Sequence, residues 1–160
     1  MSPGFETLVK AGEGQEAVSL PVAGMLLAGP AGALCFAGLI AAVGAVAPLP
    51  DPVSALLGGA TVAAGLLVGA LASTPWVARP MATWAFVLLA GQGLSLIASL
   101  LVGVGVYLTL DPAPLSFGMT GALGYLAGQL AQVRVFSRVA KAADAEARAR
   151  AEEVSASTGE

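Results

Sequence analysis

Four long apolar runs, none of which contains a charged side chain, constrain this chain more than any other feature. Between residues 17 and 133 the only charged residues are Asp51, Arg79 and Asp111, and each of them lies between two runs. A helix needs about 20 mostly apolar residues to cross a bilayer. The runs cover residues 21–46, 53–72, 82–110 and 113–133. We therefore predict an all-α integral membrane fold, a four-helix bundle built from two helical hairpins.

Composition narrows the range of functions. The chain is 57% hydrophobic and 11% charged, whereas an ordinary soluble domain has about 25% charged residues. It contains one cysteine and no histidine, so an internal disulfide is excluded, and we expect no metal and no cofactor. A nucleophile, a base and an orienting group cannot be assembled from these residues, so we do not expect an enzyme.

The positive charges predict the topology. Lys10 lies in the N-terminal segment, Arg79 lies in the second loop, and the other five Lys and Arg residues follow residue 133. Because positive residues are retained on the cytoplasmic side, we expect both termini in the cytoplasm. The chain then divides into a cytoplasmic segment (1–16), a transmembrane domain (17–133) and a charged, helical cytoplasmic tail (134–160). The residues expected to anchor the protein at lipid headgroups are Arg79, Arg134, Arg138 and Lys141.

The two loops expected on the opposite side share a pattern. Asp51-Pro52 and Asp111-Pro112 lie 60 residues apart, and each precedes a glycine-rich run. Asp can cap the free N–H groups of a helix, and Pro fits its first position, so we predict that both pairs start a helix. A duplicated hairpin would explain the likeness, and so would a common preference of tight turns on that side.

Small residues recur at helical spacing within the runs. In a bilayer there is little hydrophobic drive between helices, so close approach at small residues supplies the packing energy instead. We expect contacts between helices, or with a partner, at Gly58, Gly59, Gly65, Gly69, Gly124 and Gly128. The pattern leaves open whether these faces pack on one another or on another protein.

Uncharged polar residues form a second set of candidates. Gln92, Ser95 and Ser99 share one face of the third run, and Gln129 and Gln132 lie toward the cytoplasmic end of the fourth. An unpaired amide in hydrocarbon is costly, so this face must turn inward or toward a partner. Hydrogen bonding between helices is one interpretation, and a polar path for an ion is the other.

The tail is predicted to continue the fourth helix. Residues 134–153 are rich in Ala, Arg, Glu and Lys and contain neither Gly nor Pro. A narrow apolar stripe along them could dock a partner helix, or the helix could stand alone in solvent. The stripe comprises Phe136, Ala140, Ala143, Ala147, Ala151 and Val154. We expect residues 155–160 to be disordered.

Three short segments carry a family resemblance. They are V-S-A-L-L-G-G-A at 53–60, G-Q-G-L-S at 91–95, and P-L at 114–115 leading into L-A-G-Q-L at 126–130. These segments resemble the ATP synthase subunit I family, whose members are small four-span proteins of the bacterial inner membrane. The resemblance implies an accessory role in assembling the membrane rotor ring, with a suggested part in magnesium supply. The third span of the family often carries Glu and Lys where this chain has Gln92 and Ser95, which weakens the case for handling ions.

The leading hypothesis is a non-enzymatic accessory protein of the bacterial inner membrane that assists assembly of the F-type ATP synthase ring by helix packing. Its expected partners are the lipid bilayer, the ring-forming hairpin subunit and further copies of itself. A homo-oligomeric transporter or channel, with magnesium as a candidate ion, is one alternative, and a membrane anchor for a soluble protein is another. Nucleic acid is not an expected partner, because the formal net charge is −3 and the basic cluster is small.

Overall fold

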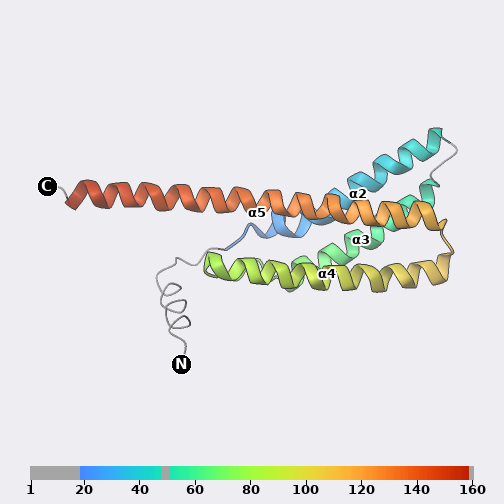
Figure 1. Ribbon diagram of the computed structural model, residues 1–160, viewed down its shortest axis with the longest axis horizontal. Coiled ribbons are helices and arrows are strands. Elements are labelled where there is room, and N and C mark those ends of the chain that lie inside the picture. The colour runs from blue at the N-terminus through green and yellow to red at the C-terminus, as the bar shows by residue number, and fades with distance from the viewer. Residues whose placement is uncertain (1–18, 48–50, 159–160) are drawn as a thin grey trace, which may run out of the picture.

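The computed structural model describes residues 19–47 and 51–158. Over these residues the protein is helical and contains no strand, which confirms the all-α prediction (Figure 1). The helices are α2 (Val22–Val46), α3 (Pro52–Ala72), α4 (Met81–Leu110) and α5 (Pro114–Thr158). The predicted N-terminal segment, 1–16, lies outside the described residues.

Prolines and a capping aspartate set the starts of the helices close to their predicted positions. Pro52 and Pro114 are the first residues of α3 and α5, where a missing N–H loses no hydrogen bond. Asp51 caps α3 as predicted, since its Oδ2 accepts the N–H of Ser54 at 2.8 Å. Hydropathy therefore located both starts to within one residue, and the Asp51-Pro52 pair also located that of α3.

The prediction for the second Asp-Pro pair is wrong. Asp111 does not start a helix: it follows the end of α4 in the left-handed conformation, with a φ of 45°. A residue in this conformation terminates a helix, and aspartate tolerates it better than most side chains. Pro114, and not Pro112, consequently takes the first position of α5.

The helices run back and forth between two ends of the molecule (Figure 1). The acidic end, as we call it, carries the turns that contain Asp51 and Asp111. The basic end carries the α3–α4 turn with Arg79 and the point where α5 passes the ends of the other helices. Opposite charges are thus separated along the length of the packed helices.

α3 lies at the centre of the packing. It contacts α2, α4 and α5, whereas α2 and α5 also pack on each other and α4 packs mainly on α3. Ala33, Val62 and Leu66 belong to a buried cluster at this centre. Trp84, which is fully buried, and Met25 belong to a second cluster that includes residues near the basic end.

Small residues four positions apart let α3 and α4 approach closely. A Cβ on Gly69 would overlap the carbonyl oxygen of Gly91, and a Cβ on Gly65 would overlap the hydroxyl of Ser99. The facing residues are Gly65 and Gly69 on α3 with Ser73 directly after it, and Gly91, Ser95 and Ser99 on α4. Such pairs of small residues are typical of helices packed in membranes.

The α2–α3 and α4–α5 hairpins correspond to one another at an offset of 62 residues. The N–H of Asp51 donates to Ser116 Oγ at 2.9 Å, and the N–H of Ala113 donates to Ser54 Oγ at 2.8 Å. These two bonds are equivalent. Residues 113 and 116 occupy the same positions at the start of α5 as residues 51 and 54 occupy at the start of α3. The same offset relates three buried residues of α2 to three of α4. They are Gly29, Ala33 and Ala37, and Gly91, Ser95 and Ser99. The correspondence favours the interpretation of a duplicated hairpin.

The correspondence fails in one place. α2 packs on both α3 and α5, but α4 packs on α3 and hardly contacts α5. A cleft therefore separates α4 from α5, with α3 beneath it.

The surface of the helices identifies the environment. α2, α3 and α4 are each long and apolar enough to cross a membrane. Large apolar side chains are exposed on them, including Leu39, Phe86 and Leu108, and soluble monomers rarely expose extended apolar surface. The chain is therefore a membrane protein. α5 is not among these three helices, since residues 114–133 carry several hydroxyl and amide groups among small residues.

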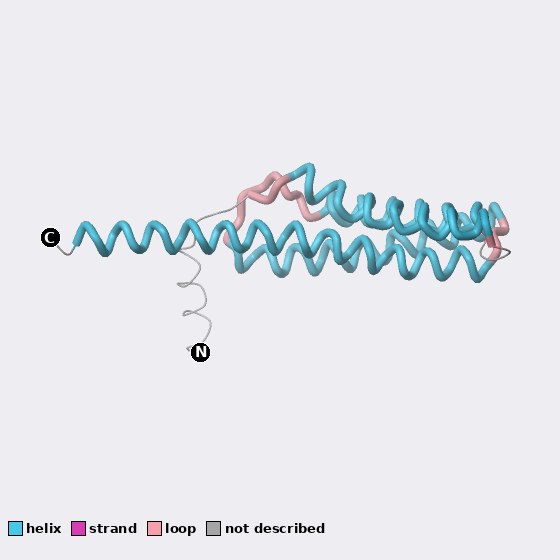
Figure 2. The backbone as a smooth tube through the Cα atoms, turned by 90° about the horizontal axis from the view of Figure 1, so that it is seen from above, coloured by secondary structure: helices cyan, strands magenta, loops and turns pink. Residues whose placement is uncertain are grey.

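α5 is one uninterrupted helix of 45 residues. Figures 1 and 2 both show it extending well past the other helices at the basic end. From Lys141 to Arg150 its side chains are mostly exposed. The expectation of disorder is wrong for residues 155–158, where the helix continues, because no Gly or Pro lies between Gly128 and residue 159.

Candidate functional site: the cleft between α4 and α5

The cleft between α4 and α5 brings together four of the five polar residues predicted within the spans: Gln92, Ser95, Ser99 and Gln132. It contains two hollows, which we call the amide cavity, nearer the basic end, and the apolar groove, nearer the acidic end. A hydrogen bond between the two hollows joins the helices: the Tyr125 hydroxyl of α5 donates to the backbone carbonyl of Gln92 in α4 at 3.2 Å. Gln92 lines the amide cavity, and Tyr125 lines the apolar groove.

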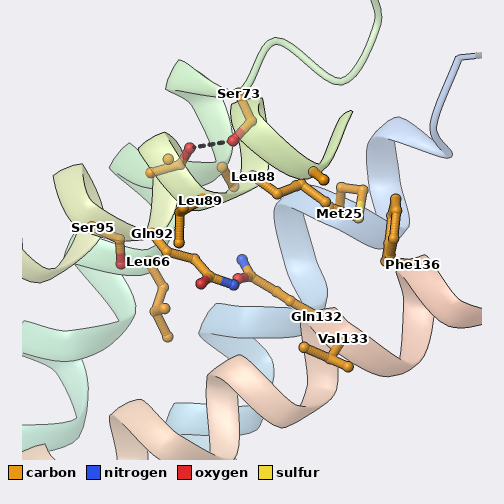
Figure 3. Close-up of a pocket in the computed structure, with 14 residues that line it drawn as sticks. Met25, Leu66, Ser73, Leu88, Leu89, Gln92, Ser95, Gln132, Val133 and Phe136 are labelled. Atoms are coloured by element: carbon orange, nitrogen blue, oxygen red, sulfur yellow. Dashed lines mark hydrogen bonds between the residues drawn. The ribbon is translucent and has the colours of Figure 1, made fainter. Parts of the chain in front are cut away.

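The amide cavity has a volume of about 220 Å³. Figure 3 shows Gln92 of α4 and Gln132 of α5 extending their amide groups toward one another, with Ser95 beside Gln92. Apolar side chains form much of the rest of the wall, among them Met25, Leu66, Leu88, Leu89, Val133 and Phe136. None of the described residues that line this cavity is charged. The cavity can therefore recognise hydrogen-bonding groups, but it offers no counter-ion.

Several polar atoms in and beside the cavity are buried without a hydrogen-bond partner. The Ser95 side chain is 2% exposed, and its Oγ is unpaired. Gln129, one turn from Gln132 on α5, lines neither hollow, and neither its Nε2 nor its Oε1 is paired. Ser73 differs, because its Oγ donates to the Gly69 carbonyl at 2.9 Å (Figure 3). An unpaired buried polar group costs about 1–3 kcal/mol, so a guest that supplies hydrogen bonds, water included, would be favoured here.

The apolar groove is larger, with a volume of about 680 Å³. Its floor is α3 at Gly58, Thr61 and Val62. Its walls come from α4 and α5 and include Leu100, Val104 and Leu108, and Phe117, Gly121 and Leu126. Its polar groups include the Thr61 and Ser99 hydroxyls, which are unpaired on side chains that are each 6% exposed. The groove is thus suited to an apolar occupant that needs little hydrogen bonding.

All six glycines predicted as contact positions lie at contacts within this chain. Gly58 meets α5, Gly59 meets α2, Gly65 and Gly69 meet α4, and Gly124 and Gly128 meet α2. A Cβ at Gly59 would overlap that of Ala37, and one at Gly128 would lie 2.7 Å from the Gly29 carbonyl oxygen. Gly105 and Gly118 differ, because a Cβ on either would meet no atom within 4 Å. Each of the six glycines thus packs on another helix of this chain, and Gly58 also lines the floor of the apolar groove.

Arg79 is tied to its own loop. Its guanidinium donates to the Ser73 carbonyl at 2.8 Å and to the Thr74 hydroxyl at 2.5 Å, and it lies 5.1 Å from the centre of the Trp84 ring. The last carbonyls of a helix lack partners within it, so Arg79 caps the end of α3. The other three predicted anchoring residues, Arg134, Arg138 and Lys141, are exposed on α5.

Three residues of structural importance escaped the sequence reasoning. They are Tyr125, which joins α5 to α4, and the serines Ser54 and Ser116, which join the two turns at the acidic end. A signal for the serines was present, since both α3 and α5 begin with Pro and carry Ser two positions later. No sequence pattern pointed to Tyr125, because its partner is a backbone carbonyl of another helix.

Hydrogen bonds shift the pKa of Asp51 at the acidic end. The hydroxyl and the N–H of Ser54 both bind the Asp51 carboxylate and hold its pKa below the usual range. Over the described ranges, no three or more His, Cys, Asp or Glu side chains are placed to hold a metal ion.

Comparisons of the chain with protein-family models, with curated proteins and with solved structures found no match. The role of the cleft therefore has to be inferred from its own chemistry: an uncharged polar cavity beside an apolar groove, between two helices that hardly contact one another.

Proposed function

We propose that this chain is a non-enzymatic accessory protein of a bacterial inner membrane, of the ATP synthase subunit I type, which receives a transmembrane helix of its partner in the apolar groove. The observation that carries the proposal is the near absence of contact between α4 and α5. It leaves a groove of about 680 Å³ at a place where the other hairpin has a packed helix.

The α2–α3 hairpin supports a helix as the occupant. Gly59 of α3 packs directly on Ala37 of α2. Gly121 is the counterpart of Gly59 at the 62-residue offset, and the nearest atoms to its Cβ position are from Gly58 and Val62 of α3, both at 3.9 Å. The same small surface is therefore present in both hairpins but lacks a helix in the second. A helix with small residues at four-residue spacing fits it.

The resemblance to subunit I supplies the identity of that helix. Ring-forming hairpin subunits are rich in Gly and Ala, so their helices present the small surface that the groove requires. The lining of the groove is largely apolar and uncharged, so binding would rest on dispersion contacts between closely approaching backbones. Such binding suits a factor that holds a subunit during assembly and later releases it.

We place all four helices across the bilayer as a bundle, with residues 114–133 of α5 as the fourth span. This segment packs on α2 and α3, so it shares their environment although it is less apolar. Retention of positive charge puts the basic end in the cytoplasm. Both termini and the protruding part of α5, from Arg134 onward, would then be cytoplasmic.

The test is a pulldown of the tagged protein from its native membrane in mild detergent, followed by mass spectrometry. Gly118→Leu places a large side chain in the groove, and the open space at its Cβ position allows the protein itself to fold. Gly105→Leu is the matched control, because Gly105 is equally open but does not line the groove. We expect the ring subunit to accompany the wild type and Gly105→Leu, and to be lost from Gly118→Leu.

Other outcomes would contradict the proposal. Recovery of the wild type alone, or with lipid only, would show that the groove holds no partner helix. A homo-oligomer broken by Gly118→Leu would assign the groove to a second copy of the chain, and ion flux in liposomes would then test the transporter alternative.

A further inference from the structure

We propose that the amide cavity binds the uncharged, hydrogen-bonding head of a molecule dissolved in the membrane, with its apolar chain leaving between α4 and α5. This site is separate from the groove assigned to a partner helix, and the proposal stands whether or not that groove is occupied.

The polar groups of the cavity define the head. Gln92 and Gln132 each offer an amide donor and an acceptor, and Ser95 offers a hydroxyl that is buried and unpaired. No described residue of the lining could neutralise a charged ligand, and an unpaired charge at this depth is strongly disfavoured. The head must therefore be neutral and must carry oxygen or nitrogen atoms that pair with amides.

The size of the cavity limits the head to about one ring. Its volume is about 220 Å³, and an apolar cavity of about 150 Å³ is known to hold benzene. The side chains of Leu66, Leu88 and Phe136 supply apolar walls for such a ring. A quinone ring and an acylglycerol head share this chemistry.

The rim of the cavity indicates access from the bilayer. Leu89 of α4 and Val133 of α5 line it and are 68% and 52% exposed on the outer surface of the helices. Both belong to runs that face hydrocarbon in a membrane protein. A ligand with an apolar chain can extend between them, whereas a water-soluble ligand would have to cross that surface.

Trp84 offers a reporter for binding. It is fully buried in a cluster with Met25, against which Leu88 and Phe136 also pack, and those three residues line the cavity. Replacing the exposed second tryptophan, Trp76→Phe, leaves Trp84 as the single source of tryptophan fluorescence. Quinones quench tryptophan fluorescence, so decylubiquinone is the direct probe.

The experiment titrates the Trp76→Phe protein, in lipid nanodiscs, with decylubiquinone and follows quenching of Trp84. Three competitors are then tested. Monodecanoyl glycerol has a second kind of neutral polar head, decylbenzene has no polar head, and decanoate has a charged head. We expect saturable quenching that decylbenzene and decanoate do not relieve. Competition by monodecanoyl glycerol would show that the site accepts acylglycerol heads as well, and its failure to compete would narrow the ligand to the quinone class.

Variants assign the binding to the named groups. Gln92→Leu and Gln132→Leu keep the side-chain volume and remove the amide, so each should weaken binding about tenfold. Thr120→Val is the control, since it removes a buried, unpaired hydroxyl that does not line this cavity. Non-saturable quenching, relief of the quenching by decylbenzene, or full binding by both folded glutamine variants would overturn the proposal.

Discussion

At the scale of single residues, Arg79 combines two roles that sequence patterns do not separate. Its positive charge predicts a cytoplasmic loop. The structure adds hydrogen bonds to Ser73 and Thr74 and a stacked position over Trp84. The first role needs only the charge, whereas the second needs the planar guanidinium.

Arg79→Lys separates these roles. Lysine keeps the charge but cannot make both hydrogen bonds while stacking on Trp84, so we expect unchanged topology and a loss of about 1–2 kcal/mol in stability. Denaturant unfolding in micelles measures the loss, and Arg138→Lys on the exposed part of α5 is the control. Equal stability of both variants and the wild type would contradict the capping role.

Asp51 makes the stability of the folded protein depend on pH. Its pKa is lowered in the folded protein by hydrogen bonds from Ser54, so the ionised form favours folding. This stabilisation is present above the ordinary aspartate pKa of about 3.9 and disappears as the pH falls through the lower, folded value. We expect the midpoint temperature of thermal unfolding of the wild type to decrease as the pH is lowered below about 4. The decrease should be smaller in Asp51→Asn. Parallel pH profiles for the two proteins would refute this assignment.

At the scale of helices, close packing of α3 on α4 depends on the absence of a Cβ at particular glycines. Gly69→Ala would place a methyl group against the Gly91 carbonyl and the Ser95 side chain, and we expect a loss of about 1–3 kcal/mol. Gly105→Ala meets nothing within 4 Å and should gain up to about 1 kcal/mol from helix propensity. Unfolding in matched micelles compares the two, and a Gly69→Ala protein as stable as Gly105→Ala would contradict the packing shown for α3.

The helices themselves were predictable from sequence, whereas their pairing was not. Hydropathy locates the starts of α3 and α5, and Pro52 marks that of α3, because both signals act within a few residues of the chain. Gly59 and Gly121 have the same spacing and chemistry, yet one is packed against α2 and the other faces the cleft. Local sequence cannot distinguish them, since the difference lies in how far α4 stands from α5. The cleft was foreseen only as a polar face that must turn inward.

At the scale of the whole molecule, the segregation of charge predicts a single orientation. Asp111→Cys and Arg148→Cys, each in a Cys35→Ala background, place one thiol at opposite ends of the protein. We expect a membrane-impermeant thiol reagent to label the first in intact cells and the second only after lysis, because positively charged residues are generally retained on the cytoplasmic side. The opposite pattern would invert the proposed topology, and labelling of both would exclude residues 114–133 as a fourth span.

α5 has a mechanical consequence. Its 45 residues, at about 1.5 Å per residue, make a rod roughly 68 Å long, more than twice the thickness of the hydrocarbon layer, about 30 Å. The same rod forms one wall of the cleft at Gly121 and ends at Thr158 beyond the other helices. No Gly or Pro hinge interrupts it between Gly128 and Thr158. A guest that tilted α5 at the cleft would therefore displace the far end of the tail by a much larger distance.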